Sequence, residues 1–440
     1  MAAAVTQELN PTAKAEKPVS KPLALATLAV HAGTEPHPST GARAIPIFQT
    51  NGFVFDDLEH GADIFAMRRP GFSYSRGSNP TVAALERRVA ALEGGKAGVA
   101  LASGQAAWLV ALLALCATGD EYVGSRQVFG GSLGLMKRLD KRLKIKCAFA
   151  DPTPESIEAQ ITERTRAIII EAIVNPTGEV VDLDGIAKVA KAHKLPFVVD
   201  STLASPALLR PIEHGADIVI HSASKFLVGG GTAIGGVIVD AGTFPWKGDQ
   251  RFPLVAAPWE DYENFVPAER HPENAFATAC RLLGLRELGP GMQATTAFLI
   301  LTGIETLPLR MRRHCDNAEA VANFLAKHEA VAHVSYPGVP SHPNHNLARR
   351  YCPDGLGSIF MITLKSAEKA KQALTRVNLF SHLVNIGESR SLIAHPASTT
   401  HRSLNAQERR SFGITDATLR LSIGLEDAPD LIADLEQALA

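Results

Sequence analysis

A carboxylate and a lysine follow two consecutive apolar stretches in the middle of the chain. Asp200 ends one stretch, and Lys225 comes shortly after the other, residues 216–220. A pyridoxal phosphate site needs a lysine amine to condense with the aldehyde, and a carboxylate to keep the pyridine nitrogen protonated so that the ring accepts electrons. The pair predicts such a site, with the hydroxyls of Ser222 and Ser224 beside the lysine to hold a phosphate. Taken alone, an aspartate and a lysine at strand ends are more often solvated loop residues than members of a cofactor site.

A second feature suits a phosphate. Ser103, Gly104 and Gln105 lie between a predicted strand, residues 97–102, and a predicted helix, residues 104–117. A helix N-terminus presents free N–H groups and a partial positive charge, and glycine lets the backbone approach an anion closely. The alternative is an ordinary helix start that Ser103 caps.

A third candidate group is the amide of Asn175, which follows the predicted strand 167–170. Beyond the carboxyl end of that strand, the amide could hydrogen-bond the phenolic oxygen of a pyridoxal ring. Because Pro176 comes next, Asn175 could instead simply begin a turn.

Arg420 is a candidate for binding a substrate carboxylate. It alternates with leucines in residues 419–424 and shares its side of this predicted strand with small residues. Such an arginine can bind a carboxylate bidentately. The alternative is a solvated charge on an exposed strand face.

Composition indicates an ordinary soluble globular protein. The 440 residues suffice for two or three domains; 46% are hydrophobic, 20% are charged, and the formal net charge is −1. This balance gives no reason to expect binding to nucleic acid or to a membrane, and no apolar run is long enough to span a bilayer. Five scattered cysteines and 15 histidines show no metal-binding spacing, so we expect no metal site and a reducing, cytoplasmic location.

Strand and helix patterns alternate from about residue 80 to 240, which predicts an α/β fold with a mostly parallel sheet covered on both faces. In such sheets ligands bind at the carboxyl ends of the strands. Residues 242–292 look like a functional or interface insertion. From residue 296 the chain reads as helical to about 325, and the strand and helix patterns after it predict a smaller α/β C-terminal domain. The N-terminal residues to about 21 read as a flexible tail without a signal peptide.

Together the motifs resemble the cysteine/methionine-metabolism family of pyridoxal phosphate enzymes from about residue 27 to the C-terminus. They are Tyr74-Ser75-Arg76, Asn79-Pro80-Thr81, Ser103-Gly104-Gln105, residues 171–177, Val199-Asp200-Ser201-Thr202, and residues 214–225, 391–401 and 420–427. Within that family the O-acetylhomoserine sulfhydrylase branch is most similar, through residues 302–307, 384–387 and 395–401, and through Phe244-Pro245-Trp246 and Arg251-Phe252-Pro253.

The resemblance implies pyridoxal phosphate fold type I, which is aspartate-aminotransferase-like. It also implies a division into an N-terminal tail and arm (1–78), a large cofactor-binding domain (79–295) and a C-terminal α/β domain (296–440). The arm would reach the active site of a neighbouring subunit, and the expected assembly is a homotetramer built as a dimer of dimers.

Individual roles are likewise implied by the resemblance. Lys225 would hold the cofactor aldehyde and shuttle protons, and Tyr74 would assist catalysis. Arg420, helped by Asn385, would bind the substrate carboxylate. The remaining cofactor contacts would be Asp200 at the pyridine nitrogen, Asn175 and Phe129 at the ring, and Gly104, Gln105, Ser222 and Ser224 with the neighbour's Tyr74 and Arg76 at the phosphate.

Phe129 departs from the family pattern. In the stretch Phe129-Gly130-Gly131-Ser132 it stands where the family usually has a tyrosine stacked on the cofactor ring. Phenylalanine can still stack by its face, but it cannot donate a proton. Any help that the tyrosine gives the leaving group must therefore come from Tyr74, Lys225 or water, or the reaction preference has shifted.

The implied reaction is replacement of the acyloxy group of an O-acyl-L-homoserine, most simply the O-acetyl ester, by sulfide or a small thiol. The product would be L-homocysteine or methionine. The alternatives are a methionine γ-lyase reaction, a cystathionine γ-synthase reaction, or a non-catalytic scaffold of the same fold. The residues do not distinguish an acetyl from a succinyl ester, and they do not identify the sulfur donor.

Overall fold

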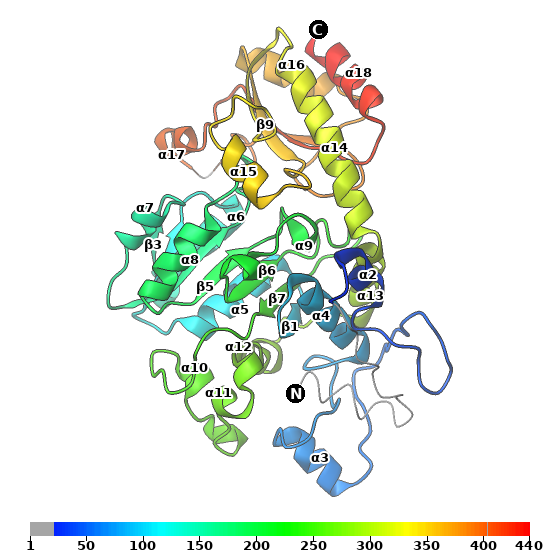
Figure 1. Ribbon diagram of the computed structural model, residues 1–440, viewed down its shortest axis with the longest axis vertical. Coiled ribbons are helices and arrows are strands. Elements are labelled where there is room, and N and C mark those ends of the chain that lie inside the picture. The colour runs from blue at the N-terminus through cyan, green and yellow to red at the C-terminus, as the bar shows by residue number, and fades with distance from the viewer. Residues whose placement is uncertain (1–21, 403) are drawn as a thin grey trace.

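The computed structural model describes residues 22–402 and 404–440, so the predicted tail lies outside the described residues. A seven-stranded sheet forms the centre of the larger part of the molecule, in the order β1-β7-β6-β5-β4-β2-β3 (Figure 1). Its strands are β1 (Ala97–Leu101), β2 (Glu121–Ser125), β3 (Lys146–Ala150), β4 (Thr165–Glu171), β5 (Phe197–Asp200), β6 (Ile218–His221) and β7 (Gly236–Asp240). Only β7 runs antiparallel to its neighbours, which confirms the predicted, mostly parallel sheet.

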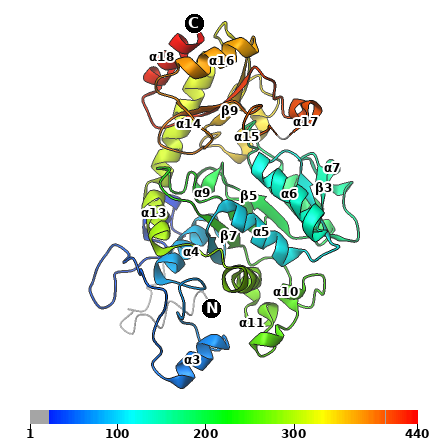
Figure 2. The same cartoon turned by 180° about the vertical axis from the view of Figure 1, so that it is seen from behind.

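Helices cover both faces of this sheet, because its central strands are apolar on both sides. In β4, Ile168 and Ile170 pack into one core cluster and Ile169 packs into the other. The first cluster also contains residues of α4 (Pro80–Glu93) and α8 (Leu183–Ala192). The second contains residues of α5 (Gly104–Leu115) and α6 (Gly130–Leu143), which lie in front when the molecule is seen from behind (Figure 2). Short elements complete this part: α7 (Pro154–Glu158), α9 (Ser205–Leu208) and η1 (Pro211–His214).

Ser103 caps α5 as predicted, because its hydroxyl accepts a 3.1 Å hydrogen bond from the amide of Ala106. The helix ends at Leu115, two residues before the predicted end, since Cys116 is extended.

A second, five-stranded sheet lies in the order β10-β11-β12-β9-β8, at one end of the molecule (Figure 1). Its strands are β8 (Val331–Ser335), β9 (Ile359–Leu364), β10 (Ser381–His382), β11 (Leu392–Ala394) and β12 (Thr418–Ser422). The accompanying helices are α14 (Leu307–Leu325), α15 (His345–Tyr351), α16 (Ala367–Arg376), α17 (Ala406–Ser411) and α18 (Ala428–Leu439).

The chain is helical from about residue 296 to 325, as expected. The region forms two helices, α13 (Ala294–Glu305) and α14, which are separated at Thr306. Pro308 lies in the first turn of α14. A proline there has no N–H to donate to the preceding turn, so it suits a new helix start and not a helix interior.

The stretch 242–292 is a set of short helices that pack on the large sheet. Trp246 stacks on Phe276 with their ring centroids 5.5 Å apart. Both rings are buried in the core cluster that contains α5. The elements are α10 (Pro253–Ala256), η2 (Glu260–Tyr262), α11 (Pro267–Arg270), η3 (Pro272–Asn274), α12 (Ala275–Cys280) and η4 (Arg281–Leu288).

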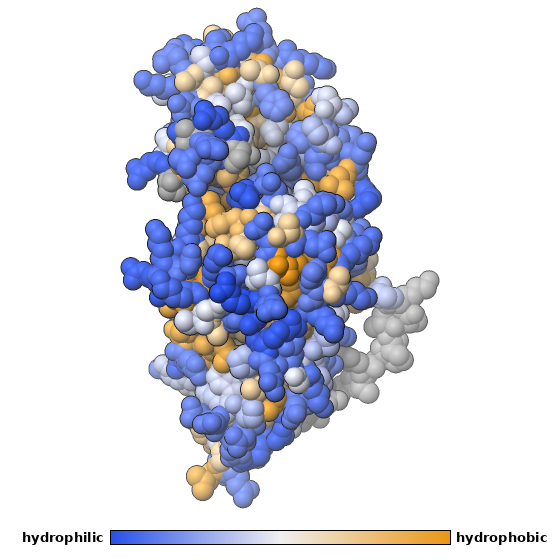
Figure 3. Space-filling view, turned by 90° about the vertical axis from the view of Figure 1, so that its left-hand side faces the viewer, coloured by the Kyte–Doolittle hydropathy of each residue, from blue (hydrophilic) through white to orange (hydrophobic). Residues whose placement is uncertain are grey.

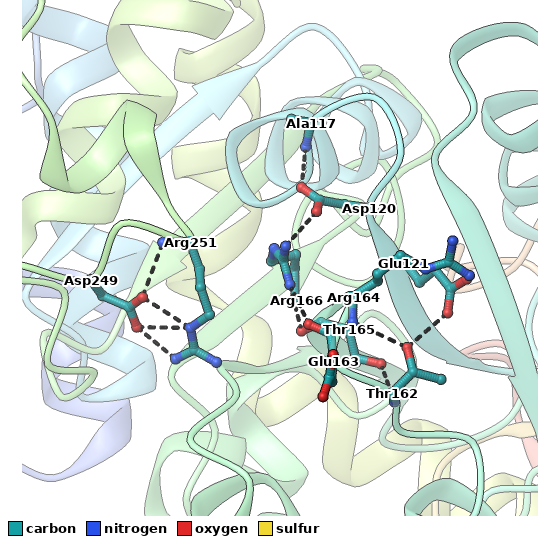
Figure 4. Close-up of polar contacts among 10 residues, drawn as sticks. All are labelled: Ala117, Asp120, Glu121, Thr162, Glu163, Arg164, Thr165, Arg166, Asp249 and Arg251. Carbon is teal, nitrogen blue, oxygen red and sulfur yellow. Dashed lines mark hydrogen bonds and ion pairs between the residues drawn. The ribbon is translucent and has the colours of Figure 1, made fainter.

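The N-terminal segment carries α2 (Leu25–His31) and α3 (Leu58–Phe65). Helix α3 lies at the end of the molecule opposite the small sheet (Figure 1). The amino-terminal edge of the large sheet is joined by charged side chains (Figure 4). Arg166 pairs with Asp120 over 2.7 Å, and Glu121 accepts hydrogen bonds from Thr162 and Arg164. These contacts connect the amino-terminal ends of β2 and β4, at the edge of the sheet opposite the predicted site.

Candidate active site

The carboxyl ends of β4, β5 and β6 bring the central predicted residues to one edge of the large sheet. Glu171 ends β4 and lies opposite Asp200, which ends β5. Lys225 follows β6, the strand next to β5. Sheet topology thus places the predicted carboxylate at the end of one strand and the lysine just beyond the end of its neighbour, as the strand-end pattern indicated.

Asp200 is held by two donors. Its Oδ2 accepts a 2.6 Å hydrogen bond from Nε1 of Trp108, and its Oδ1 accepts a 2.9 Å bond from the amide of Thr202. The side chain is buried, with 8% of its surface exposed. Burial and these two hydrogen bonds exclude a solvated loop residue, and the carboxylate is held in place to pair with the nitrogen of a cationic ring. Sequence reasoning missed Trp108, because within the apolar helix 104–117 it resembles any core side chain.

Lys225 is half-buried, and its Nζ donates a hydrogen bond to Oδ1 of Asn385. Burial lowers the pKa of Lys225, Arg420 lowers it further, and Glu388 raises it. The amine is therefore easier to deprotonate than a solvated lysine, as a proton carrier requires.

Gly104 and Ser222 approach each other at the N-terminus of α5. A Cβ on Gly104 would lie 2.7 Å from Cβ and 2.9 Å from Oγ of Ser222, so a side chain cannot be accommodated. The first amides of α5 thus lie close to Ser222, and this close approach is possible only because residue 104 is a glycine. This arrangement suits a phosphate.

The two other predicted phosphate contacts have protein partners. Gln105 donates from Nε2 to Ser132 over 3.3 Å. The Ser224 hydroxyl donates to the carbonyl of Gly235 over 3.1 Å and accepts from its amide over 3.0 Å.

Glu171 connects the two residues predicted to contact the cofactor ring. Its Oε1 accepts a 2.8 Å hydrogen bond from the amide of Phe129, and its Oε2 accepts a 2.9 Å bond from the amide of Asn175. Burial, with a smaller contribution from Asp200, raises the pKa of Glu171 to about 8. Glu171 belongs to one of the family-like motifs, and its position at a strand end was the sequence signal that could have indicated a role.

Arg420 reaches the same region from β12 of the small sheet. Its Nη1 donates to Oδ1 of Asn175 over 3.2 Å, and its Nη2 donates to the carbonyl of Asn385 over 3.0 Å. It is 3% exposed, which excludes a solvated strand charge, and burial lowers its pKa to about 10. No acidic side chain among the described residues forms an ion pair with it. A buried guanidinium without a carboxylate partner is suited to bind one from a ligand.

Tyr74 and Arg76 are not brought to this group within one chain. Arg76 donates to the carbonyl of Leu285 over 3.0 Å, and its guanidinium lies 5.8 Å from the ring centroid of Tyr74, which is 50% exposed. Both line a cavity of about 1210 Å³ between the N-terminal segment and the part of the molecule that contains the large sheet. Neither Lys225 nor Asp200 lines that cavity, so it is not the candidate site.

These residues fit the group predicted from the sequence. Pyridoxal phosphate needs an amine, an anion at its ring nitrogen and donors at its phosphate. Lys225 supplies the amine, and Asp200, which accepts two hydrogen bonds, supplies the anion. The start of α5 at Gly104 supplies the donors. By contrast, residues 22–402 and 404–440 contain no cluster of ligands that could hold a metal ion. None of the helices in the same residues combines the length and hydropathy of a membrane crossing.

Comparison with known proteins gives consistent results. Residues 26–440 match the family model described as Cys/Met metabolism PLP-dependent enzyme. The O-acetyl-L-homoserine sulfhydrylase of Leptospira meyeri is 44% identical over 94% of this chain and 96% of its own. The homocysteine synthase of Schizosaccharomyces pombe is 43% identical over 94% and 97%. A Campylobacter jejuni crystal structure, assigned as an O-acetylhomoserine (thiol)-lyase and carrying N'-pyridoxyl-lysine-5'-monophosphate, superposes with a TM-score of 0.92 at 36% identity, covering 95% of this chain and 100% of that one.

Proposed function

Because the chain belongs to the Cys/Met metabolism family of PLP-dependent enzymes, we propose that it replaces the acetoxy group of O-acetyl-L-homoserine by sulfur from sulfide or a small thiol. The product would be L-homocysteine or methionine. Family membership confirms the resemblance predicted from the motifs, the type I fold and the use of pyridoxal phosphate. The structural observation that supports an amino-acid substrate is the buried guanidinium of Arg420, which has no acidic partner among the described residues and shares Asn385 with Lys225. The acetoxy ester is inferred from the relatives.

The cofactor, when bound, supplies an electron sink that stabilises negative charge at the substrate α carbon. Asp200 would hold the ring nitrogen, and Lys225 would bind the aldehyde. Phe129 and Asn175 would contact the ring. The amides of Gly104 and Gln105, with the hydroxyls of Ser222 and Ser224, would hold the phosphate, as the fit of Gly104 against Ser222 supports.

Arg420 orients the substrate in this proposal. Its guanidinium binds the α-carboxylate, and its contacts with Asn175 and with the backbone of Asn385 keep the fork in place. A fixed carboxylate presents the α proton to the same amine on each turnover.

Lys225 is the proton carrier. Its lowered pKa allows the free amine to take the proton from Cα at Nζ and to give it up again. Once Nζ is free, it takes a second proton, from Cβ, as acetate leaves Cγ; hydrosulfide then adds at Cγ, and protons return to Cβ and Cα. Because acetate is a stable anion, it can depart without a proton donor, and this is compatible with Phe129 in place of the family tyrosine.

The test is product analysis by mass spectrometry of purified holoenzyme with O-acetyl-L-homoserine, with and without sulfide. Homocysteine formed only with sulfide supports the proposal, and Lys225→Ala should abolish it. Parallel reactions with O-succinyl-L-homoserine and with methanethiol define the ester and the donor.

Three other results would contradict the proposal. 2-Oxobutyrate as the main product in the presence of sulfide would indicate a γ-lyase, and Phe129→Tyr would then be the first reversion to make. Reaction only with cysteine as the sulfur donor would indicate a cystathionine γ-synthase. A folded protein without the yellow absorption of bound cofactor would indicate a scaffold.

We further propose that the enzyme is a homotetramer of two dimers, and that each dimer shares its active sites. Tyr74 and Arg76 lie away from Lys225 in their own chain, which supports a role at the site of a second copy. The N-terminal segment that carries them exposes Val54 and Leu58 at 95% and 89%. Apolar residues also reach the surface in patches across the middle of the face in Figure 3. Exposed apolar groups of this kind are typical of surfaces that bind another protein.

The cytoplasm is the proposed location. All five cysteines are free and buried in the structure, as expected for a chain that folds in a reducing compartment.

A further inference from the structure

Glu388 is linked to Lys225 through a single side chain. Nζ of Lys225 donates to Oδ1 of Asn385, and Nδ2 of Asn385 donates to Oε1 of Glu388 over 2.5 Å. Glu388 is 9% exposed. A continuous line of hydrogen bonds therefore joins the lysine amine to a nearly buried carboxylate 163 residues further along the chain.

The carboxylate determines which way the Asn385 amide faces. An asparagine amide has one acceptor oxygen and one donor nitrogen. With its nitrogen committed to Glu388, its oxygen must face Lys225. If the amide rotated by half a turn, its nitrogen would face the lysine ammonium and its oxygen would face the carboxylate, and both contacts would be lost.

The backbone around Glu388 is fixed from two sides. The amide of Gly387 donates to Oγ of Ser422 over 3.1 Å, and the carbonyl of Asn385 accepts from Arg420 over 3.0 Å. The segment is thus attached to β12, the strand that carries the proposed carboxylate-binding arginine.

Glu388 also packs on the glycine-rich loop that follows Lys225. A Cβ on Gly231 would lie 2.7 Å from its carboxyl carbon, and Gly231 has a φ of +69°. Both the space and the left-handed backbone require glycine there. The carboxylate therefore lies against the segment that leads away from the lysine.

Charged neighbours act on Lys225 in opposite directions. Burial and Arg420 lower the pKa of Lys225, whereas Glu388 raises it. Arg390 lies on the outer side of Glu388, with Nη2 3.6 Å from Oε2, and is 68% exposed. Solvent screens this outer cation, so the inner carboxylate keeps most of its effect on the amine.

We infer that Glu388 is a positioning residue, which through Asn385 holds the Lys225 amine in one place while the amine gives up and takes back protons. The inference rests on the proposed function, because it serves the lysine that this function makes the proton carrier. Glu388 itself touches no reacting atom in this assignment.

The experiment removes the negative charge of residue 388 and keeps the shape of its side chain. Glu388→Gln makes this change, and Glu388→Asp retains the charge. Glu368→Gln is a matched control on the exposed side of α16. In each holoenzyme the visible absorption of the cofactor is titrated with pH, because this readout needs no turnover. The anion favours a proton on the lysine nitrogen, so the midpoint in Glu388→Gln should fall by on the order of one pH unit. Glu388→Asp should move it back towards wild type, and Glu368→Gln should leave it unchanged.

Steady-state kinetics supply a second expectation. In Glu388→Gln we expect kcat to fall about tenfold and KM to stay within about twofold, because the substrate carboxylate still meets Arg420. If Glu388→Gln does not retain cofactor, Glu388→Ala is titrated instead, and the same fall in midpoint is required.

An unchanged midpoint in the Glu388 variant would overturn the inference. So would an equal fall in Arg390→Ala, because Glu388 would then matter only as the ion-pair partner of that arginine. Failure of the proposed function would be a separate result. If the wild-type enzyme makes no homocysteine but the Glu388→Gln variant still shows the lower midpoint, the proposed reaction is refuted and the link between Glu388 and Lys225 stands.

Discussion

Trp108 donates a 2.6 Å hydrogen bond from Nε1 to Oδ2 of Asp200. The indole comes from α5, the helix whose first residues form the proposed phosphate site, and the carboxylate ends β5. In the proposed site, one helix therefore contributes to two parts of the cofactor site. Its first residues face the phosphate, and Trp108 in its second turn orients the carboxylate that meets the ring nitrogen.

Trp108→Phe should weaken cofactor retention by about 10- to 100-fold, because a hydrogen bond to a charged group contributes about 1.5–3 kcal/mol. Dialysis of the holoenzyme followed by absorption spectroscopy measures this. The control is Trp246→Phe, since Trp246 is equally buried but stacks on Phe276 in the core. Equal cofactor loss in both variants would mean that packing, and not the hydrogen bond, is responsible.

Arg420→Ala should raise KM for O-acetyl-L-homoserine by about 100-fold or more, because the substrate carboxylate loses its only proposed cationic partner. The cofactor should remain bound, as its absorption will show. Arg312→Ala removes an exposed guanidinium and should leave KM unchanged. A KM close to wild type in Arg420→Ala would remove the carboxylate role of this residue.

Shared active sites predict complementation between inactive subunits. Lys225→Ala and Arg76→Ala should each be inactive, and after dissociation and mixing about one quarter of wild-type activity should return, because half of the random dimers are hybrids with one intact site. Lys225→Ala mixed with Asp200→Ala is the control and should stay inactive, since both changes fall in the same chain's site. No recovery in the first mixture would place Arg76 outside the shared site.

His314 makes stability depend on pH. It is fully buried, its Nδ1 donates to the carbonyl of Ile423 over 2.7 Å, and burial lowers its pKa to about 4. In the unfolded chain its pKa is near 6.5, so unfolded protein binds the proton first, and stability is lost as pH falls from about 6.5 towards 4. Between pH 7 and pH 5 this one group should cost about 2 kcal/mol of unfolding free energy.

Urea unfolding at the two pH values tests this prediction. His314→Asn, whose amide can replace Nδ1 as donor, should lose about 2 kcal/mol less than wild type on acidification. The exposed His382→Asn should behave like wild type. Identical pH dependence in wild type and His314→Asn would show that other groups cause the acid sensitivity.

The sequence alone indicated β1, β4, β5 and β6 of the large sheet and the helices α4, α5 and α8, but not β2, β3, β7 or α6. A continuous apolar run predicts a strand that is buried on both faces, and parallel strands have their carboxyl ends at one edge of the sheet. Asp200, Lys225 and the start of α5 could therefore be located from local patterns. The same reasoning placed Arg420 on a strand. It indicated a helical region from about residue 296 to 325 without locating the break between α13 and α14, where Pro308 lies in the first turn of a new helix.

Only the tertiary structure decided which distant side chains meet at that edge. Trp108 reaches Asp200 across 92 residues, and Asn385 reaches Lys225 across 160. The roles of Glu171 and Glu388 became visible only with those partners. The physical reason is that a local pattern records whether a side chain is buried, whereas its hydrogen-bond partner depends on which remote segment the chain topology brings alongside.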